Sequence, residues 1–310
     1  MLAGKLQAAA SNTNAWDLDN AVYQGTPLNS FPVTAQDTNP NGGFFKPDGL
    51  KMYVVGHTND NVYEYDLSVA WDISTASYLQ SGYVGGQDTL PYGLFFSSDG
   101  LKMYVLGSQN DRVYEYSLSV AWDITTLTYL FRAFSWAGQA DVAYGLFFKP
   151  DGSRMYILGS KLFSGGYRVF QYNLSVAGDV STASYSSDNA YVESQDTLAA
   201  DVFFRPDGLK MYILGSSTNY VYEYDLSVAW NISTYSYTLR RFSLAPRSAS
   251  SFNGIFFKTD GSRMYIIGLN DSVFQYDLSV AWNIATTSYT NPTTNFFSVA
   301  AQIPNPEGVF

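Results

Sequence analysis

Residues 93–107 read Gly-Leu-Phe-Phe-Ser-Ser-Asp-Gly-Leu-Lys-Met-Tyr-Val-Leu-Gly, and close copies of this stretch recur along the chain. Its Asp-Gly pair returns with the aspartate at Asp48, Asp99, Asp151, Asp207 and Asp260. The copies lie 51 to 56 residues apart, and each reads Phe-Phe-x-x-Asp-Gly-x-x-Met-Tyr. Such a regular spacing indicates a single repeat architecture, although 310 residues would otherwise suggest about two domains.

The pattern within one unit predicts four short strands. Residues 92–96 are apolar, and the Asp-Gly pair that follows tolerates the positive φ of a tight hairpin. Residues 102–106 form a second apolar run, and residues 112–116 alternate in a way typical of a strand. A fourth strand is expected near residues 128–136. Four strands in about fifty residues predict the blade of an all-β propeller.

The wording of the repeat resembles that of YVTN and lactonase-like propellers. The resemblance rests on Gly-Leu-Phe-Phe-x-x-Asp-Gly, Met-Tyr-Val-x-Gly and Val-Tyr-Glu-Tyr-Asp-Leu, and it extends over about residues 15–310. The longer block Val-Tyr-Glu-Tyr-Asp-Leu-Ser-Val-Ala-Trp-Asp-Ile-Ser-Thr-Ala-Ser-Tyr, residues 62–78, is similar to tandem repeats in structural proteins of aquatic bacteriophages. This resemblance implies the fold more strongly than any one activity, because propellers carry many unrelated functions.

The repeat does not begin and end at blade boundaries. Residues 1–14 are expected to form a tether or arm, and residues 15–310 a single propeller domain of five full repeats with split half-repeats at the termini. Three interpretations follow: a six-bladed ring whose last blade is incomplete, a five-bladed ring with spare strands, or a ring completed by a neighbouring chain. We favour six blade positions of four-stranded antiparallel sheet.

Composition excludes several classes of function. The net charge of −10 argues against a nucleic-acid partner, because phosphate binding needs a basic surface. The chain has no cysteine and a single histidine, so a thiolate or multi-histidine metal site is not expected. We predict no metal and no cofactor. We find no secretory signal and no apolar run long enough to insert in a membrane, and we expect a virion or extracellular location.

Any binding site is expected on the loops between the second and third strands of each blade and between successive blades. These loops vary from copy to copy, and variable loops on a rigid scaffold are where binding usually occurs. The candidate ligand-binding residues on or beside these loops are His57, Tyr83, Arg112, Arg132, Trp136, Tyr167, Arg168, Tyr220 and Arg247. Aromatic rings beside arginine suit a surface glycan, whereas the simpler interpretation is scattered exposed aromatics.

Other residues repeat with the blades, and we interpret them as structural. They are Trp71, Trp122, Trp230 and Trp282, together with the five aspartates of the Asp-Gly pairs. Gly178 replaces the tryptophan in one copy. The aspartates could suggest calcium sites, but hairpin-turn chemistry accounts for them without any metal.

The favoured function is a non-enzymatic structural propeller of a virion appendage, such as a tail fibre, or of an extracellular assembly. Its expected partners are other structural proteins or copies of itself, and surface glycan. The alternative is a lactonase-like hydrolase with an axial metal, for which the candidate acids are Asp141, Asp201 and Glu307. A further alternative is a filament subunit that exchanges strands at its incomplete blade.

Overall fold

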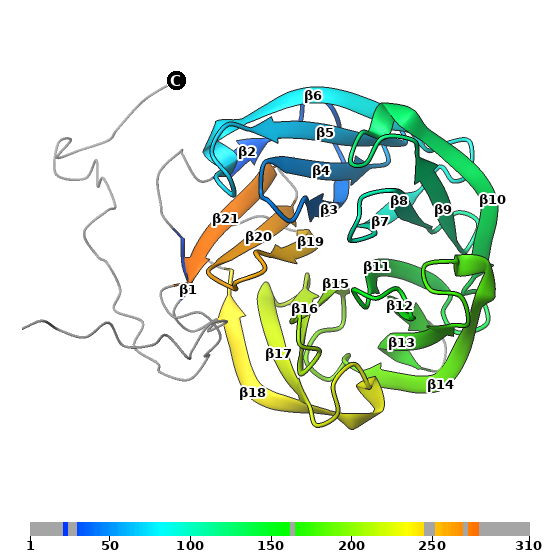
Figure 1. The fold of residues 1–310 in the computed structure, drawn as a ribbon. Coiled ribbons are helices and arrows are strands. Elements are labelled where there is room, and N and C mark those ends of the chain that lie inside the picture. Colours follow the sequence, from blue (N-terminus) through cyan, green and yellow to red (C-terminus); the bar gives the residue numbers. More distant parts are fainter. Residues whose placement is uncertain (1–20, 24–29, 162–164, 245–251, 269–271, 279–310) are drawn as a thin grey trace, which may run out of the picture.

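The protein is a five-bladed β-propeller, described here from a computed structural model (Figure 1). The structure describes residues 21–23, 30–161, 165–244, 252–268 and 272–278. The expected arm at residues 1–14 lies outside these ranges, as do Arg247, Trp282 and Glu307. Among the described residues, the only helices are single turns of 3-10 helix, and none is long and apolar enough to cross a membrane.

Each blade is an antiparallel sheet whose strands run in order from the axis to the rim. The innermost strands are β3 (Pro40–Phe45), β7 (Pro91–Phe96), β11 (Val142–Phe148), β15 (Ala199–Phe204) and β19 (Phe252–Phe257). The second strands are β4 (Lys51–Gly56), β8 (Lys102–Gly107), β12 (Arg154–Lys161), β16 (Lys210–Gly215) and β20 (Arg263–Gly268). The third strands are β5 (Asn61–Leu67), β9 (Arg112–Leu118), β13 (Gly166–Leu174), β17 (Tyr220–Leu226) and β21 (Ser272–Leu278). The outer strands of blades one to four are β6 (Ala76–Tyr83), β10 (Leu127–Ser135), β14 (Ala183–Tyr191) and β18 (Tyr235–Ser243).

The fifth blade takes its outer strand from the start of the chain. β1 (Ala21–Tyr23) pairs with β21 in the register Ala21↔Leu278, and β2 (Ser30–Pro32) pairs with the same strand. The six blade positions favoured from the sequence are therefore not confirmed, because blade five packs directly against blade one and the ring closes with five. β1 and β2 of the same chain pair with the outer edge of β21, which is the edge that strand exchange with a neighbouring chain would use (Figure 1).

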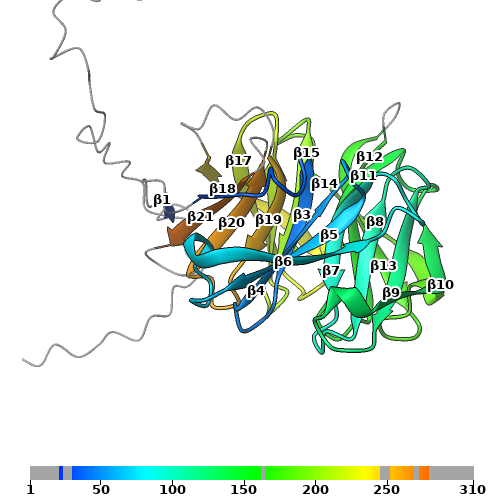
Figure 2. The same ribbon diagram turned by 90° about the horizontal axis from the view of Figure 1, so that it is seen from above.

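The two faces of the ring are built from different connections, as the edge-on view shows (Figure 2). The turn face, as we name it, carries the Asp-Gly hairpins between first and second strands and the links between third and fourth strands. In blade one, Asp48 accepts a hydrogen bond from Leu50 N–H at 3.0 Å, and Gly49 takes a φ of +75°, where glycine is unstrained. The loop face carries the remaining connections.

The four turn-face links that the structure describes each contain one turn of 3-10 helix: η3 (Ile73–Thr75), η4 (Ile124–Thr126), η5 (Val180–Thr182) and η6 (Ile232–Thr234). The residue before each helix caps it, as Asp72 does for Ser74 N–H at 3.0 Å. A buried acid or amide on the third strand reaches the helix of the following blade. Glu64 accepts from Ile124 N–H and Glu115 from Val180 N–H. These contacts hold neighbouring blades in register.

The loop face is more regular than its sequence indicated. Asp37, Asp88 and Asp196 are buried at equivalent positions in three blades. Each accepts backbone hydrogen bonds from its own loop and from a neighbouring loop, as when Asp88 accepts from Leu90 N–H at 2.9 Å and Asn110 N–H at 2.9 Å. A buried carboxylate that receives several N–H donors fixes a loop conformation, so part of this face is scaffold.

Candidate functional site

A ring of five phenylalanines closes the axis of the propeller. Its members are Phe44, Phe95, Phe147, Phe203 and Phe256, one from each innermost strand. Neighbouring rings meet edge to face, with centroids 5.2 to 5.4 Å apart all the way round. This is the geometry that aromatic pairs prefer. The ring divides the axial space into a cavity on the turn face and a neck toward the loop face.

The cavity on the turn face has a volume of about 350 Å³. The phenylalanine ring forms its floor, and its walls include Trp71, Phe148 and Tyr104. Polar and charged residues also line the cavity, among them Ser97 and Lys102. A concave, largely apolar pocket of this size with a few polar groups is typical of a small-molecule site.

The neck lies on the other side of the ring, two residues before each phenylalanine along the inner strands. Four blades place glycine there: Gly42, Gly93, Gly145 and Gly254. Blade four places Asp201 at this position, and its side chain occupies space that the glycines leave free. The neck holds about 20 Å³, which is room for one water molecule beside the carboxylate.

Asp201 has an unusual environment for a carboxylate. Its oxygens accept hydrogen bonds from Val202 N–H at 2.8 Å and from Ile255 N–H at 2.9 Å, so the side chain ties blade four to blade five. Burial raises the pKa of Asp201 to about 7, although both N–H donors favour the charged form. An acid that titrates near neutrality in a narrow polar niche is a candidate for acid–base chemistry.

Of the other axial acids considered from the sequence, Asp141 does not line the neck with Asp201, and Glu307 lies outside the described residues. Asp141 lies on the connection before β11, where its N–H donates to Ser160 O at 2.8 Å. Within the described ranges, no three histidine, cysteine or acidic side chains gather to form a metal site. The donor set around Asp201 therefore does not fit the axial metal of the hydrolase alternative, and we derive no step through a metal.

Two of the aromatic candidates from the loop face belong to the core. The Trp136 side chain is fully buried, and that of Tyr167 is 7% exposed and stacks on Tyr144 with centroids 5.9 Å apart. The prediction that these two rings stack on a glycan at the surface is wrong, because their faces are covered by protein.

The basic candidates are engaged at separate places. Arg132 lies on the outer strand β10 and forms ion pairs with Glu115 at 3.2 Å and Asp179 at 3.4 Å. The guanidinium of Arg168 donates to Asn189 Oδ1 and lies 5.0 Å from the centre of the Tyr191 ring. Arg112 is exposed at the start of β9. These three side chains do not share a pocket.

The remaining candidates also stay apart. The Nδ1 atom of His57 lies 2.8 Å from the Asn41 amide near the axis, whereas Tyr83 is 61% exposed at the end of the outer strand β6. Tyr220 begins β17, with the Arg241 guanidinium 4.4 Å from its ring centre. The described loop-face candidates are thus spread over four blades and form no common site.

Similarity to known proteins is found at the level of solved structures. No protein-family model matches the chain, and no curated protein matches its sequence. A presumed 6-phosphogluconolactonase from Bacteroides uniformis is 14% identical, with 73% of this chain and 63% of that one covered and a TM-score of 0.44. A second presumed 6-phosphogluconolactonase, from Bacteroides fragilis, is 13% identical over 66% of this chain and 55% of that one, with a TM-score of 0.43.

A periplasmic gluconolactonase from Pseudomonas aeruginosa is 14% identical over 66% of this chain and 54% of that one, with a TM-score of 0.42. The chain spans less than two thirds of the length of these structures. The expectation of a non-enzymatic virion-appendage or glycan-contacting propeller is corrected by this finding, since the similar structures are of the lactonase type. Among the described residues, the loop-face candidates do not converge on one site, whereas a cavity of about 350 Å³ lies on the turn face.

A comparison of the repeat copies with one another points to the axial residues, whereas the residue types taken singly do not. Asp201 and Gly178 are each exceptions at an otherwise repeated axial or link position. Aligning the copies and asking which one departs from the others would single out both. The phenylalanine ring was visible as Phe-Phe in the repeat, but its closure across the axis depends on the number of blades.

Proposed function

We propose that the protein is a small-molecule hydrolase in which Asp201 activates a water molecule in the axial neck. The observation that carries this proposal is a carboxylate with a pKa of about 7 beside room for one water, on an axis otherwise lined at that level by glycine. A base with a pKa near the working pH combines an adequate ionised fraction with adequate basicity.

The chemistry needs only this carboxylate, water and a carbonyl substrate, whose carbonyl group must approach the water from the loop face because the phenylalanine ring closes the other side of the neck. Ionised Asp201 accepts a proton from water while the water oxygen bonds to the carbonyl carbon. When the tetrahedral species collapses and its C–O bond to the leaving oxygen breaks, Asp201 returns the proton to that oxygen. A lactone would give the open hydroxy acid. Lactones are the first substrates to test because the repeat resembles those of lactonase-like propellers.

The test compares the wild type with Asp201→Gly on a panel of γ- and δ-lactones. Glycine is the residue of the other four blades, so this variant is expected to fold. We expect hydrolysis to fall by about 100-fold or more, the usual contribution of a general base. For the wild type, kcat/KM should rise with pH and level off above about 7.

The matched control is Asp188→Asn on the outer strand β14, where the carboxylate contacts Gln171 far from the neck. This variant should keep the wild-type rate. Equal rates for the wild type and Asp201→Gly would remove Asp201 from the reaction, and no hydrolysis of any lactone by the folded wild type would contradict the proposed substrate class.

A further inference from the structure

In three described blades a tryptophan from the link stacks on phenylalanines of two adjacent blades, and one of these tryptophans, Trp71, also lines the turn-face cavity. Trp122 illustrates the arrangement: it stacks on Phe96 of its own blade, with centroids 5.6 Å apart, and on Phe44 of the preceding blade at 6.2 Å. Trp71 and Trp230 make the same two contacts in their blades, with centroids 5.7 to 6.5 Å apart. The indole therefore forms a wedge between adjacent blades.

Blade three has Gly178 at this position, and its backbone follows the path of the others. The φ of Gly178 is +68°, against +66°, +67° and +65° for Trp71, Trp122 and Trp230. The Tyr104 hydroxyl donates to Gly178 O at 2.8 Å, just as the Tyr53 hydroxyl donates to Trp122 O at 2.6 Å. The link therefore keeps its conformation without the indole, so the space between blades two and three is not closed by a shift of backbone.

The cavity extends into that space. Its lining includes Phe95 and Phe148, which correspond to the two rings that hold the indole in the other blades. It also includes Gly152, Gly178 and Tyr104. We name this part of the cavity, bounded by these five residues, the Gly178 lobe. Its walls are three aromatic side chains and two glycine backbones, a shape that fits a flat apolar ring.

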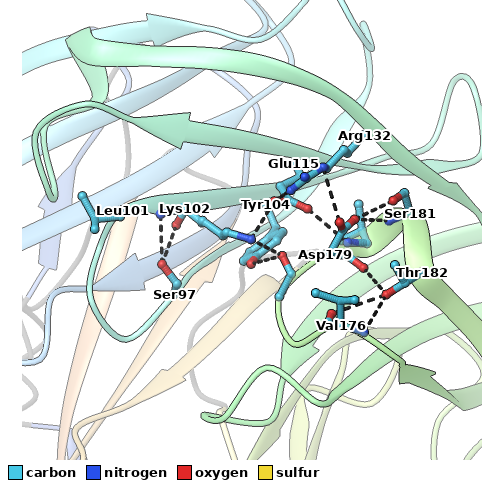
Figure 3. A network of polar contacts seen from close by, with 12 residues as sticks. Ser97, Leu101, Lys102, Tyr104, Glu115, Arg132, Val176, Asp179, Ser181 and Thr182 are labelled. Atoms are coloured by element: carbon cyan, nitrogen blue, oxygen red, sulfur yellow. Dashed lines mark hydrogen bonds and ion pairs between the residues drawn. The ribbon is translucent and has the colours of Figure 1, made fainter.

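The charges beside the lobe already pair with one another (Figure 3). Lys102 Nζ donates to Gly178 O at 2.7 Å and contacts Glu115 at 2.8 Å. Arg132 bridges Glu115 and Asp179 on the outer side of the same network. A ligand in the lobe therefore meets satisfied polar groups, which favours a neutral ring over an ion.

We propose that the Gly178 lobe binds a small molecule through an indole-sized, neutral, planar aromatic group. The group takes the place that tryptophan holds in the other blades and stacks on Phe95 and Phe148. Apolar cavities that protein side chains leave unfilled bind aromatic probes of matching shape. The phenylalanine ring separates this site from Asp201, so the inference is independent of the proposed hydrolase.

Indole itself is the probe, and binding is measured by calorimetry and by ligand-detected NMR on the full chain. We expect one indole to bind the wild type and Gly178→Trp to weaken binding at least 10-fold, because the new side chain fills the lobe. Tryptophan is compatible with the backbone there, although the Tyr104 hydroxyl must yield, since a Cβ on Gly178 would lie 2.8 Å from it. Asp201→Gly is the matched control and should bind indole as the wild type does.

A second measurement holds even if Gly178→Trp does not fold. In nuclear Overhauser spectra of the wild type, bound indole protons should contact the rings of Phe148 and Tyr104. Contacts only elsewhere, no binding up to the solubility of indole, or equal binding by folded Gly178→Trp would each overturn the assignment.

Discussion

Gly178 and Asp201 are exceptions to the same repeat, and they change it in opposite directions. At Gly178 one blade lacks a large side chain that the repeat supplies elsewhere, and a pocket extends into the space. At Asp201 one blade has an acidic side chain where the others have glycine, and the axial neck gains a titratable group. The two lie on opposite sides of the phenylalanine ring. In a repeat protein the common residues build the scaffold, and single departures are where a site can differ from its own copies.

The largest effect is expected when a second blade is made to resemble blade three. Trp122→Gly should lower the free energy of unfolding by about 3–5 kcal/mol, the usual cost of removing a buried aromatic side chain. Glycine suits the backbone there, because Trp122 has a φ of +67°. Urea unfolding monitored by circular dichroism gives the value. The same variant should gain a second indole-binding site.

A cost for Trp122→Gly below about 1 kcal/mol would contradict the role of the tryptophan as an inter-blade wedge. Leu101→Ala provides the control on the same face. Leu101 is 44% exposed beside the Asp-Gly turn of blade two, so its loss should change the stability little. A comparison of the two variants separates loss of the wedge from any general sensitivity of the turn face.

A smaller effect is expected when the fourth blade is restored to the common pattern at Asp201. Burial raises the pKa of Asp201 from 3.8 to about 7, so the folded state binds the proton more tightly than the unfolded chain. Stability from this group is present below about pH 4 and is lost as the pH rises through 7. The loss is at most about 4 kcal/mol and less where water reaches the carboxylate.

The measurement is the difference in unfolding free energy between Asp201→Gly and the wild type from pH 4 to pH 8. This difference should shift by about 2 kcal/mol in favour of the variant as the pH rises, since other titrating groups cancel in the comparison. A pH-independent difference would show that the pKa of Asp201 is not raised in the folded protein.

The fold could be predicted from the sequence further than the site could. The Phe-Phe, Asp-Gly and Met-Tyr spacing gave the four strands of each blade because turn chemistry and alternation are local properties. The number of blades was not local: it depends on which strands meet across the ring and on β1 and β2 pairing with β21. The burial of Trp136 could not be predicted from the sequence either, because the residues around a tryptophan in a glycine-containing loop do not show whether its side chain faces inward or outward.

The smallest effect concerns the pair of polar side chains beside the Gly178 lobe, for which the repeat offers two versions. Blade two has Lys102 with Glu115, whereas blades three and five have arginine with glutamine: Arg154 with Gln171 and Arg263 with Gln275. In those blades the arginine donates to the link carbonyl, as Arg154 Nη1 does to Trp230 O at 2.6 Å. Lys102 donates to Gly178 O in the same way.

Glu115→Gln should therefore cost only about 1 kcal/mol, because the amide can still accept from Val180 N–H and the partly exposed Lys102 and Arg132 keep access to water. Adding Lys102→Arg recreates the pair of blades three and five and should recover most of that loss. Urea unfolding of the two single variants and the double variant gives the coupling energy between the positions. Strictly additive losses would mean that the pair is not exchangeable between blades. Recovery would show that the lysine–glutamate and arginine–glutamine pairs are exchangeable between blades at this position beside the Gly178 lobe.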